Sequence, residues 1–368
     1  MKKWIAFILA FVLVLGLCAC GADDGSKTED GGKDGKVTAA KLTQVIKTEK
    51  GVDGKDRTMK STVEYDEDHY IIATKSYLDD KLGYAVTYDK DLNKPLVELT
   101  YDDNGEIIDR TENTYDEKGN CVEKTSVYTV DGKDITLKRI STYDANGNVL
   151  TEASYEDGKL SYEQRYTYTA DGKLARESYI NSDGLEESYT ENTYDDQGNL
   201  LSVKVDGMLS GSYVTYENAY ENGKLVEVKV YDQWEQDGEL TNLVRYDAQG
   251  NITLRVGYEN SKEWSRTEYT YENDKLIKVV DFDNGEECYV ELYTYNAAGK
   301  LTELSRTVPG GKSQRSAYSY DEDGNITSFK QYEDGELSGE YILTYETVTV
   351  PEAVAEQLRA LVDSLALD

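Results

Sequence analysis

Two tryptophans are the side chains of this sequence best placed to hold a ligand. Trp234 and Trp264 fall in neighbouring predicted turns that lie two strands apart, which is ~9.5 Å at ~4.8 Å per strand. Indole rings at this spacing could stack on one glycan or peptide, because an aromatic ring presents a large apolar face. The alternative is that both rings pack against the sheet.

Paired oxygen ligands recur in the turns and could bind a divalent cation. The Asp-x-Asn and Asp-x-Asp pairs are Asp102 and Asn104, Asp144 and Asn146, and Asp321 and Asp323. This is the opening spacing of a calcium loop, but the remaining ligands, including a distal bidentate Glu, are missing. A type I turn also favours Asp at its first position, so turn chemistry explains these residues without a metal. The sequence predicts no cofactor, with Ca²⁺ at these turns as the alternative.

Catalytic groups are scarce in this chain. His69 is the only histidine, which excludes a Ser-His-Asp or Cys-His arrangement and a histidine-based zinc site. A carboxylate pair could hydrolyse a glycosidic bond, yet the acidic residues fall in turns and on alternating strand faces, where solvation accounts for them. We therefore predict that the chain is not an enzyme, with a carboxylate-based glycoside hydrolase as a distant alternative. The formal net charge of −32 repels polyanions and argues against nucleic acid as a partner.

These side chains belong to a tandem repeat with two registers. A tyrosine, followed in many repeats by Asp-x-x-Gly, recurs every 23 to 28 residues, and a second, mostly aromatic series lies midway between. The first series is Tyr65, Tyr88, Tyr115, Tyr143, Tyr168, Tyr194, Tyr220, Tyr246, Tyr271, Tyr295, Tyr320 and Tyr345. The second is Tyr77, Tyr101, Tyr128, Tyr155, Tyr179, Val205, Tyr231, Tyr258, Phe282, Thr307 and Tyr332. Two registers per period predict two strands and two turns per repeat; we call the turns after the first series YD turns and those after the second midway turns.

Both kinds of turn carry residues that tight hairpins need. In Asp144-Ala145-Asn146-Gly147, the Asp begins a type I turn and the Gly takes the left-handed conformation of the closing bulge. Two-residue type I′ turns are predicted at Asp157-Gly158, Asp206-Gly207, Asn284-Gly285 and Asp334-Gly335. The midway turns vary more in sequence than the YD turns, and variable loops on a regular scaffold are where binding residues usually lie.

The segments between the turns alternate with period two, as in residues 160–168, where Ser161, Glu163, Arg165 and Thr167 share one face. The chain has 32 Tyr and four Phe, which suits a thin sheet because the tyrosine ring packs while its hydroxyl stays hydrated. The predicted fold is all-β: a tandem antiparallel β-hairpin array, forming an extended or coiled meander sheet rather than a sandwich, with a short C-terminal helix. Each hairpin is then buried only by its neighbours.

Four segments follow from these patterns. Residues 1–19 form a signal peptide, because the apolar run that ends at Leu17 is too short to span a membrane. Residues 20–36 form a flexible tether rich in Gly and Asp, and residues 37–350 form the repeat domain. In residues 351–368 the helical spacing of Val354, Leu358 and Leu361 predicts an amphipathic helix that covers an open edge of the final strand. A partner-binding helix is the alternative.

The end of the signal peptide, Leu17-Cys18-Ala19-Cys20, resembles the bacterial lipobox. The resemblance implies that Cys20 becomes the acylated N-terminal residue, and two acyl chains hold a protein stably on a membrane. With Gly21 following, it also implies the outer face of the cytoplasmic membrane, or the outer membrane if the host has one. Ordinary cleavage near Ala19 and an uncleaved anchor are the alternatives.

Segments such as 245–253 (RYDAQGNIT) and 141–149 (STYDANGNV) look like the YD repeats of Rhs-type proteins. The resemblance covers about residues 50–345 and implies a spiralling β-sheet shell of the kind found in toxins, adhesins and large surface proteins. Asn or Lys replaces the family's usual Arg after the Gly. Half-repeats such as 220–225 (YENGKL) equally resemble the bacterial MORN-variant repeat, another surface module.

The sequence thus predicts a lipid-anchored, monomeric surface protein that acts as a non-catalytic binding, adhesion or scaffold module. Its partners are the membrane, through the anchor, and a glycan or surface-protein ligand. The alternative is a carbohydrate-capture lipoprotein that uses Trp234 and Trp264.

Overall fold

The computed structural model describes residues 36–50, 54–130, 132–207, 212–232 and 238–364. These residues form antiparallel strands joined by tight turns, followed by one C-terminal helix, α2 (Glu352–Ser364). This confirms the predicted fold class. No helix in the described part of the chain has both the length and the apolar character needed to cross a bilayer. The chain divides into two compact units.

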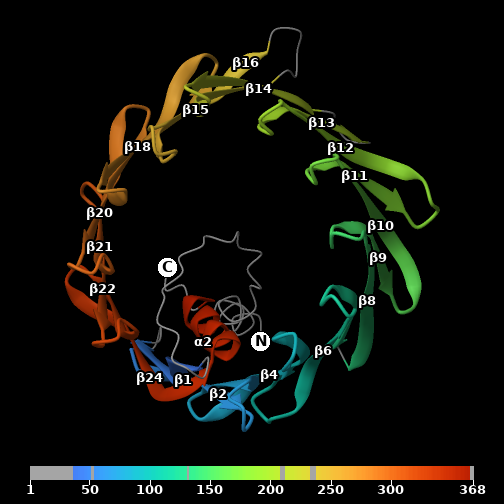
Figure 1. The fold of residues 1–368 in the computed structure, drawn as a ribbon, viewed down its shortest axis with the longest axis vertical. Coiled ribbons are helices and arrows are strands. Elements are labelled where there is room, and N and C mark those ends of the chain that lie inside the picture. The colour runs from blue at the N-terminus through green and yellow to red at the C-terminus, as the bar shows by residue number, and fades with distance from the viewer. Residues whose placement is uncertain (1–35, 51–53, 131, 208–211, 233–237, 365–368) are drawn as a thin grey trace. The chain divides into compact units, whose positions relative to one another are not determined.

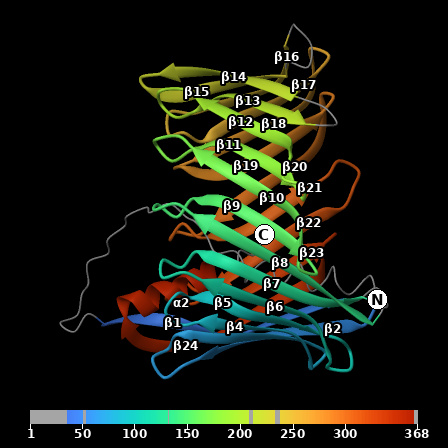
Figure 2. The same ribbon diagram turned by 90° about the vertical axis from the view of Figure 1, so that its right-hand side faces the viewer.

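The first unit comprises Met1–Lys138, Tyr318–Gln331 and Leu337–Asp368. Its strands are β1 (Lys36–Lys50), β2 (Asp56–Tyr65), β3 (Ile71–Leu78), β4 (Lys81–Asp89), β5 (Lys94–Tyr101), β6 (Ile107–Tyr115), β7 (Cys121–Val130), most of β23 (Ile326–Glu333) and most of β24 (Glu336–Pro351). From β1 to β7, each strand pairs antiparallel with the next, so the chain meanders (Figure 2).

The second unit comprises Arg139–Ala317 and Tyr332–Glu336. Its strands are β9 (Val149–Glu156), β10 (Lys159–Tyr168), β11 (Leu174–Asn181), β12 (Glu186–Tyr194), β13 (Leu200–Gly207), β14 (Ser212–Glu221), β15 (Lys224–Asp232), β16 (Glu239–Tyr246), β17 (Ile252–Glu259), β18 (Lys262–Glu272), β19 (Lys275–Asp283), β20 (Glu286–Tyr295), β21 (Leu301–Thr307) and most of β22 (Ser313–Tyr320). They form the same kind of antiparallel meander, from β9 to β22. β8 (Lys133–Tyr143) contributes residues to both units.

The first and last strands of the array pair with each other in the first unit. β1 runs antiparallel to β24, from Lys36 opposite Pro351 to Glu49 opposite Gly339. The sequence predicted an open edge on the final strand beneath the helix. That expectation is wrong on this side of β24, because β1 occupies the edge and satisfies its hydrogen bonds.

Helix α2 packs beside this pair of strands (Figure 1). Val354, Ala355 and Leu358 of the helix are buried against Ala39 of β1 and Val350 of β24. The predicted amphipathic face therefore contributes to the main core of the unit. The largest fully buried side chains of the described chain, among them Phe329 and Leu42, all belong to this unit.

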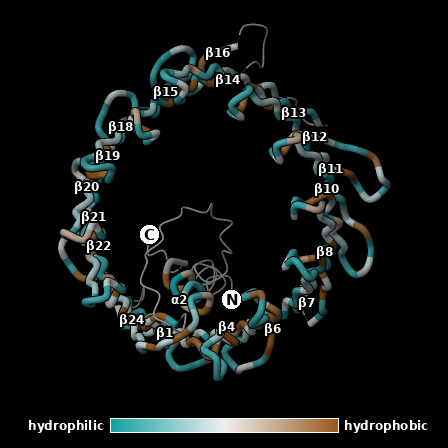
Figure 3. The backbone as a smooth tube through the Cα atoms, in the orientation of Figure 1, coloured by the Kyte–Doolittle hydropathy of each residue, from teal (hydrophilic) through white to brown (hydrophobic). Residues whose placement is uncertain are grey.

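Elsewhere the sheet is thin. Of the described tyrosines, only Tyr84 is buried, at 7% exposure, and hydrophilic and hydrophobic residues alternate along the strands (Figure 3). In β10, Ser161, Arg165 and Thr167 are exposed, as the period-two pattern predicts, but Glu163 of the same face is half-buried. Tyrosine suits such a sheet because its ring packs and its hydroxyl reaches a polar partner.

The turns agree with their sequences in most places. Gly147 lies at φ 88°, the left-handed conformation predicted for the bulge, and Asp157 and Gly158 lie at φ 48° and 79°, as a type I′ turn requires. The predicted turn at Asp206-Gly207 is wrong, because both residues continue β13 and pair with β12. The register also shifts beside most of the repeat tyrosines, as between Thr193 and Tyr194, and such bulges increase local twist.

Candidate functional site

In the Asp-x-x-Gly turns, the Asp carboxylate accepts hydrogen bonds from residues of the same turn. Oδ1 of Asp144 accepts the backbone N–H groups of Asn146 at 2.8 Å and Asn148 at 2.9 Å, and Oδ2 accepts the side-chain amide of Asn148 at 2.9 Å. These donors stabilise the ionised form and lower the pKa of Asp144, with the Asn148 amide as the largest cause. Each such turn is therefore a compact hydrogen-bonded unit.

The residue pairs predicted for calcium take part in these turn bonds. At Asp102, Oδ1 accepts the backbone N–H groups of Asn104 and Glu106 at 2.8 and 2.9 Å, and Oδ2 accepts the Asn104 amide at 3.1 Å. Asp321 likewise accepts a backbone N–H from Asp323. Over the described residues, no group of three or more His, Cys, Asp or Glu side chains could hold a metal ion. Turn hydrogen bonds thus account for the Asp-x-Asn spacing.

A tyrosine hydroxyl joins many of the YD turns to the preceding hairpin. The Tyr194 hydroxyl donates to the main-chain carbonyl of Leu174 at 2.8 Å, and the Asn192 amide donates to the same carbonyl at 3.0 Å. Tyr65, Tyr115, Tyr168, Tyr295 and Tyr345 each donate to a carbonyl 19 to 23 residues earlier in the same way. The tyrosine of the first series therefore has a structural role, because its hydroxyl hydrogen-bonds one hairpin to the next.

The residue directly after a YD turn adds a second link. Nζ of Lys275 donates to the carbonyl of Gly299 at 2.5 Å and lies 5.0 Å from the ring centre of Tyr295. Nζ of Lys173 lies 5.5 Å from the ring centre of Tyr194. At this position the sequence departs from the Rhs-type pattern. A lysine here reaches the next hairpin, whereas an asparagine binds the Asp of its own turn.

Exposed apolar side chains gather at the opposite ends of the strands, beside the midway turns. In the first unit these are Ile107, Ile108, Val130 and Leu337, and in the second they are Leu185, Tyr213, Trp264 and Val308; all are 38 to 65% exposed. The YD-turn end has Ile72, Leu150 and Leu201, at 37 to 39%, while Leu137, Leu292 and Ile342, at 40 to 48%, lie further inside their strands. We call the midway-turn end of either unit its midway-turn surface. Sequence reasoning pointed to the midway turns but missed their aliphatic residues, whose signal is a large apolar side chain directly beside a turn.

Trp264 is the predicted ligand-binding residue that the structure describes. It is the third residue of β18, at a midway turn, and is 47% exposed. Trp234, its predicted partner, and Cys20, the predicted lipidation site, lie outside the described residues. The exposure of Trp264 leaves much of its indole available to a ligand.

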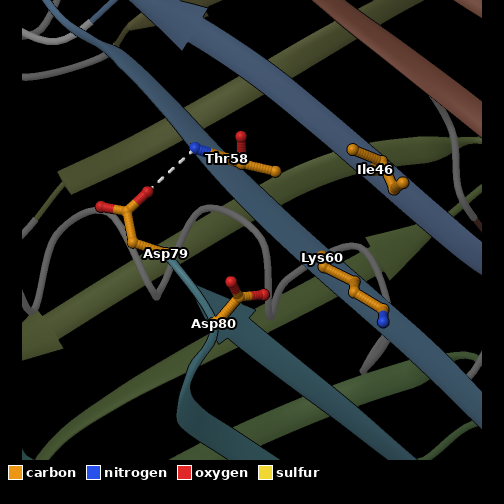
Figure 4. A pocket seen from close by; sticks show the side chains of 5 residues that line it. All are labelled: Ile46, Thr58, Lys60, Asp79 and Asp80. Carbon is orange, nitrogen blue, oxygen red and sulfur yellow. Dashed lines mark hydrogen bonds between the residues drawn. The ribbon is translucent and has the colours of Figure 1, made fainter.

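A shallow hollow lies between β1, β2 and the turn that follows β3. It is lined by Ile46, Thr58, Lys60, Asp79 and Asp80 (Figure 4). Oδ1 of Asp79 accepts the N–H of Thr58 at 3.2 Å, and the N–H of Asp79 donates to the Thr58 carbonyl at 2.9 Å. Asp79 therefore extends the hairpin contact, and Lys60 and Asp80 are the other charged groups of the hollow.

Glu98 of β5 and Asp109 of β6 form a pair of interacting carboxylates. Glu98 accepts the hydroxyl of Tyr84 at 2.6 Å, and Lys124 approaches Glu98 at 3.9 Å. Burial, and then the nearby charge of Glu98, raise the pKa of Asp109, while Lys124 opposes the shift. A raised pKa beside a second carboxylate is the feature that a carboxylate-based hydrolase would need, so this pair is where that alternative can be tested.

The variant Asp109→Asn should be more stable than the wild type at pH 7. A carboxyl with a raised folded pKa contributes stability below its unfolded pKa of about 3.8, and this is lost as the pH rises through the folded pKa. Because Asp109 is only partly buried, the gain should stay below ~1 kcal/mol. Urea denaturation at pH 7 and pH 3 should show the gain only at pH 7. Asp103→Asn, which removes an exposed carboxylate and the same charge, should show no comparable gain.

No family model matches this chain, and no curated protein matches it. Among solved structures, it is similar to TcdB2-TccC3-TEV, with 14% identity over 79% of this chain and 19% of that chain and a TM-score of 0.41. It is similar to TcdB2-TccC3 at 12% identity, 85% and 21% coverage and a TM-score of 0.32. A porin-like protein from Bacteroides uniformis matches at 13% identity, 61% and 95% coverage and a TM-score of 0.24.

The chain thus spans about a fifth of the two TcdB2-TccC3 chains. TM-scores below 0.5 at these identities establish no shared fold. The repeat β-fold of this chain therefore rests on its own strand register and turn geometry.

Proposed function

We propose that this chain is a non-catalytic, lipid-anchored surface protein that binds a ligand through its midway-turn surface. The observation that supports this proposal most directly is the chemical difference between the two ends of the strands. At the YD-turn end, Tyr hydroxyls and Lys ammonium groups link neighbouring hairpins. At the midway-turn end, large apolar side chains such as Leu185, 65% exposed, meet solvent. Apolar groups gathered on the surface of a unit are typical of interaction sites.

The same arrangement supports a monomer. β1 pairs along one edge of β24, so neither strand offers that edge to a second copy. The formal net charge of −32 makes two copies of the chain repel each other, and it also repels nucleic acid. The proposed attachment to the membrane rests on the lipobox-like Cys20.

Replacing three aliphatic residues of the midway-turn surface by serine should reduce adhesion by about tenfold or more. The variant carries Ile107→Ser, Leu185→Ser and Leu337→Ser, and leaves Trp264 in place. Each change removes apolar contact area from the midway-turn surface of its own unit, and tenfold in affinity corresponds to ~1.4 kcal/mol. The measurement is attachment of cells that display the intact lipoprotein to arrayed surface proteins and glycans.

The matched control places the same chemistry at the other end of the strands. It carries Ile72→Ser, Leu150→Ser and Leu201→Ser, three aliphatic residues that are 37 to 39% exposed beside YD turns. Adhesion of this control should stay at the wild-type level. Both variants should keep their melting temperatures, because exposed substitutions usually change stability by less than ~0.5 kcal/mol. Equal adhesion by the two variants would contradict the assignment of the binding surface.

A further inference from the structure

Ser265 and Trp264 pack closely against a glycine on the neighbouring strand. A Cβ atom on Gly257 would lie 2.5 Å from Oγ of Ser265, 2.9 Å from Nε1 of Trp264 and 3.1 Å from Cε2 of the indole, and real Cβ atoms essentially never approach another atom to less than 3.0 Å. Gly257 does not lie at positive φ, so the backbone alone does not require glycine there. The indole therefore lies against the main chain of β17, while the residue remains 47% exposed. A glycine inside a strand often marks such a close approach.

Polar side chains extend from this contact in one row across four strands. Gly257 pairs with Asn242 of β16 on one side and Ser265 of β18 on the other, and Ser265 pairs with Asp283 of β19. Directly paired residues of antiparallel strands share a face of the sheet. The row spans ~14 Å at ~4.8 Å per strand. It offers an amide, a hydroxyl and a carboxylate beside an exposed ring.

Arg266, which follows Ser265 in β18, is already paired. Arg266 contacts Glu263 at 3.3 Å and Glu268 at 2.9 Å, and its guanidinium lies 4.2 Å from the ring centre of Phe282. Asp283 is exposed in the row, and the formal net charge of the chain is −32, so an anionic ligand would be repelled. The charge of the surface therefore favours a neutral ligand over an acidic one.

We propose that Trp264, with Asn242, Ser265 and Asp283, forms a subsite for a neutral saccharide. The C–H face of a sugar ring packs on the indole, and the sugar hydroxyls exchange hydrogen bonds with the amide, the serine hydroxyl and the carboxylate. This inference rests on the proposed function, since it assigns a ligand class to one part of the midway-turn surface.

The test titrates the detergent-solubilised full-length protein with neutral oligosaccharides of glucose, galactose, mannose and xylose, and follows heat and tryptophan fluorescence. At least one of these sugars should bind the wild type. Trp264→Ala should weaken that binding by about tenfold or more, as expected when an aromatic anchor is removed. Trp264→Phe should weaken it less, and Asp283→Asn should weaken it severalfold.

Gly257→Ala should also reduce affinity, because the added methyl displaces both the Ser265 hydroxyl and the indole, two groups of the subsite. The matched control is Leu201→Ala, which truncates an exposed residue beside a YD turn and should bind within twofold of the wild type. Trp264→Ala should keep the wild-type melting temperature, which separates loss of binding from loss of fold.

The subsite is overturned if no neutral sugar binds the wild type, or if Trp264→Ala binds the sugar as well as the wild type does. It is also overturned if the ligand that requires Trp264 is a sulfated heparin oligosaccharide. Each of these results leaves the proposed function standing when the Ile107, Leu185 and Leu337 triple variant still loses adhesion. Equal adhesion by the two triple variants would instead remove the proposed function.

Discussion

Replacing Leu358 by alanine should lower the free energy of unfolding by ~2–5 kcal/mol, the usual cost of truncating a buried leucine. Leu358 is 0% exposed and packs in the cluster of Ala39, Val350, Val354 and Ala355. Its removal leaves a cavity between α2 and the β1–β24 pair, and the backbone of two paired strands cannot collapse readily to fill it. Equilibrium denaturation in urea measures the loss.

The control for this substitution lies on the opposite face of the same helix. Glu356 is exposed, so Glu356→Ala removes a side chain of the helix without opening the core. Its effect should remain within ~0.5 kcal/mol. Similar losses for the two variants would show that the helix does not depend on its buried face.

The same variant should reveal where the array opens first. Because α2 packs on β1 and β24, a cavity there weakens the pairing of the first and last strands more than pairing elsewhere. Amide hydrogen exchange in Leu358→Ala should therefore accelerate in β1 and β24 before it does in β9 to β21, which lie in the other unit. Uniform acceleration across both units would indicate global unfolding instead.

Local chemistry explains what the sequence could predict. The turn at Asp144 follows from an Asp that accepts nearby backbone N–H groups and a glycine at positive φ, and both signals lie within four residues. The alternation in β10 is likewise local. These features recur in many of the repeats, so the fold class could be inferred from one chain.

The features that the sequence could not predict depend on pairing between residues far apart in the chain. Thr43 of β1 donates its hydroxyl to the Thr344 carbonyl, 301 residues away, and no short pattern marks that contact. The turn at Asp206-Gly207 failed for a similar reason, since pairing with Ser188 keeps Gly207 in the strand. Tertiary pairing there overrides turn propensity.

In the candidate site, too, the local feature could be predicted from the sequence and the long-range features could not. Trp264 could be singled out because tryptophan is rare in this chain and falls at a turn. The role of Gly257 could not, because a glycine within a strand gives no indication of which side chain approaches it. The row of Asn242, Ser265 and Asp283 depends on strand register, which bulges shift by a residue in many of the hairpins.

Replacing Cys20 by alanine should abolish fatty-acid labelling and move nearly all of the protein out of the detergent phase on phase partitioning. The reason is the lipobox-like segment that ends at Cys20, which we propose as the site of acylation. Each buried CH₂ group of an acyl chain contributes ~0.8 kcal/mol to membrane binding, and stable attachment needs two chains. Removing the acceptor thiol removes all of this free energy at once, so the expected change is close to all-or-none.

Cys18 provides the matched control, because it lies two residues earlier, on the signal-peptide side of the predicted cleavage site. Cys18→Ala should label and partition as the wild type does. Continued labelling of Cys20→Ala would contradict the anchor assignment. The Cys20→Ala protein should also keep the wild-type melting temperature and sugar affinity, since the residues of the proposed subsite, from Asn242 to Asp283, are remote from it in the chain. Cells that produce it should nevertheless lose adhesion, because a ligand held by a detached protein no longer holds the cell.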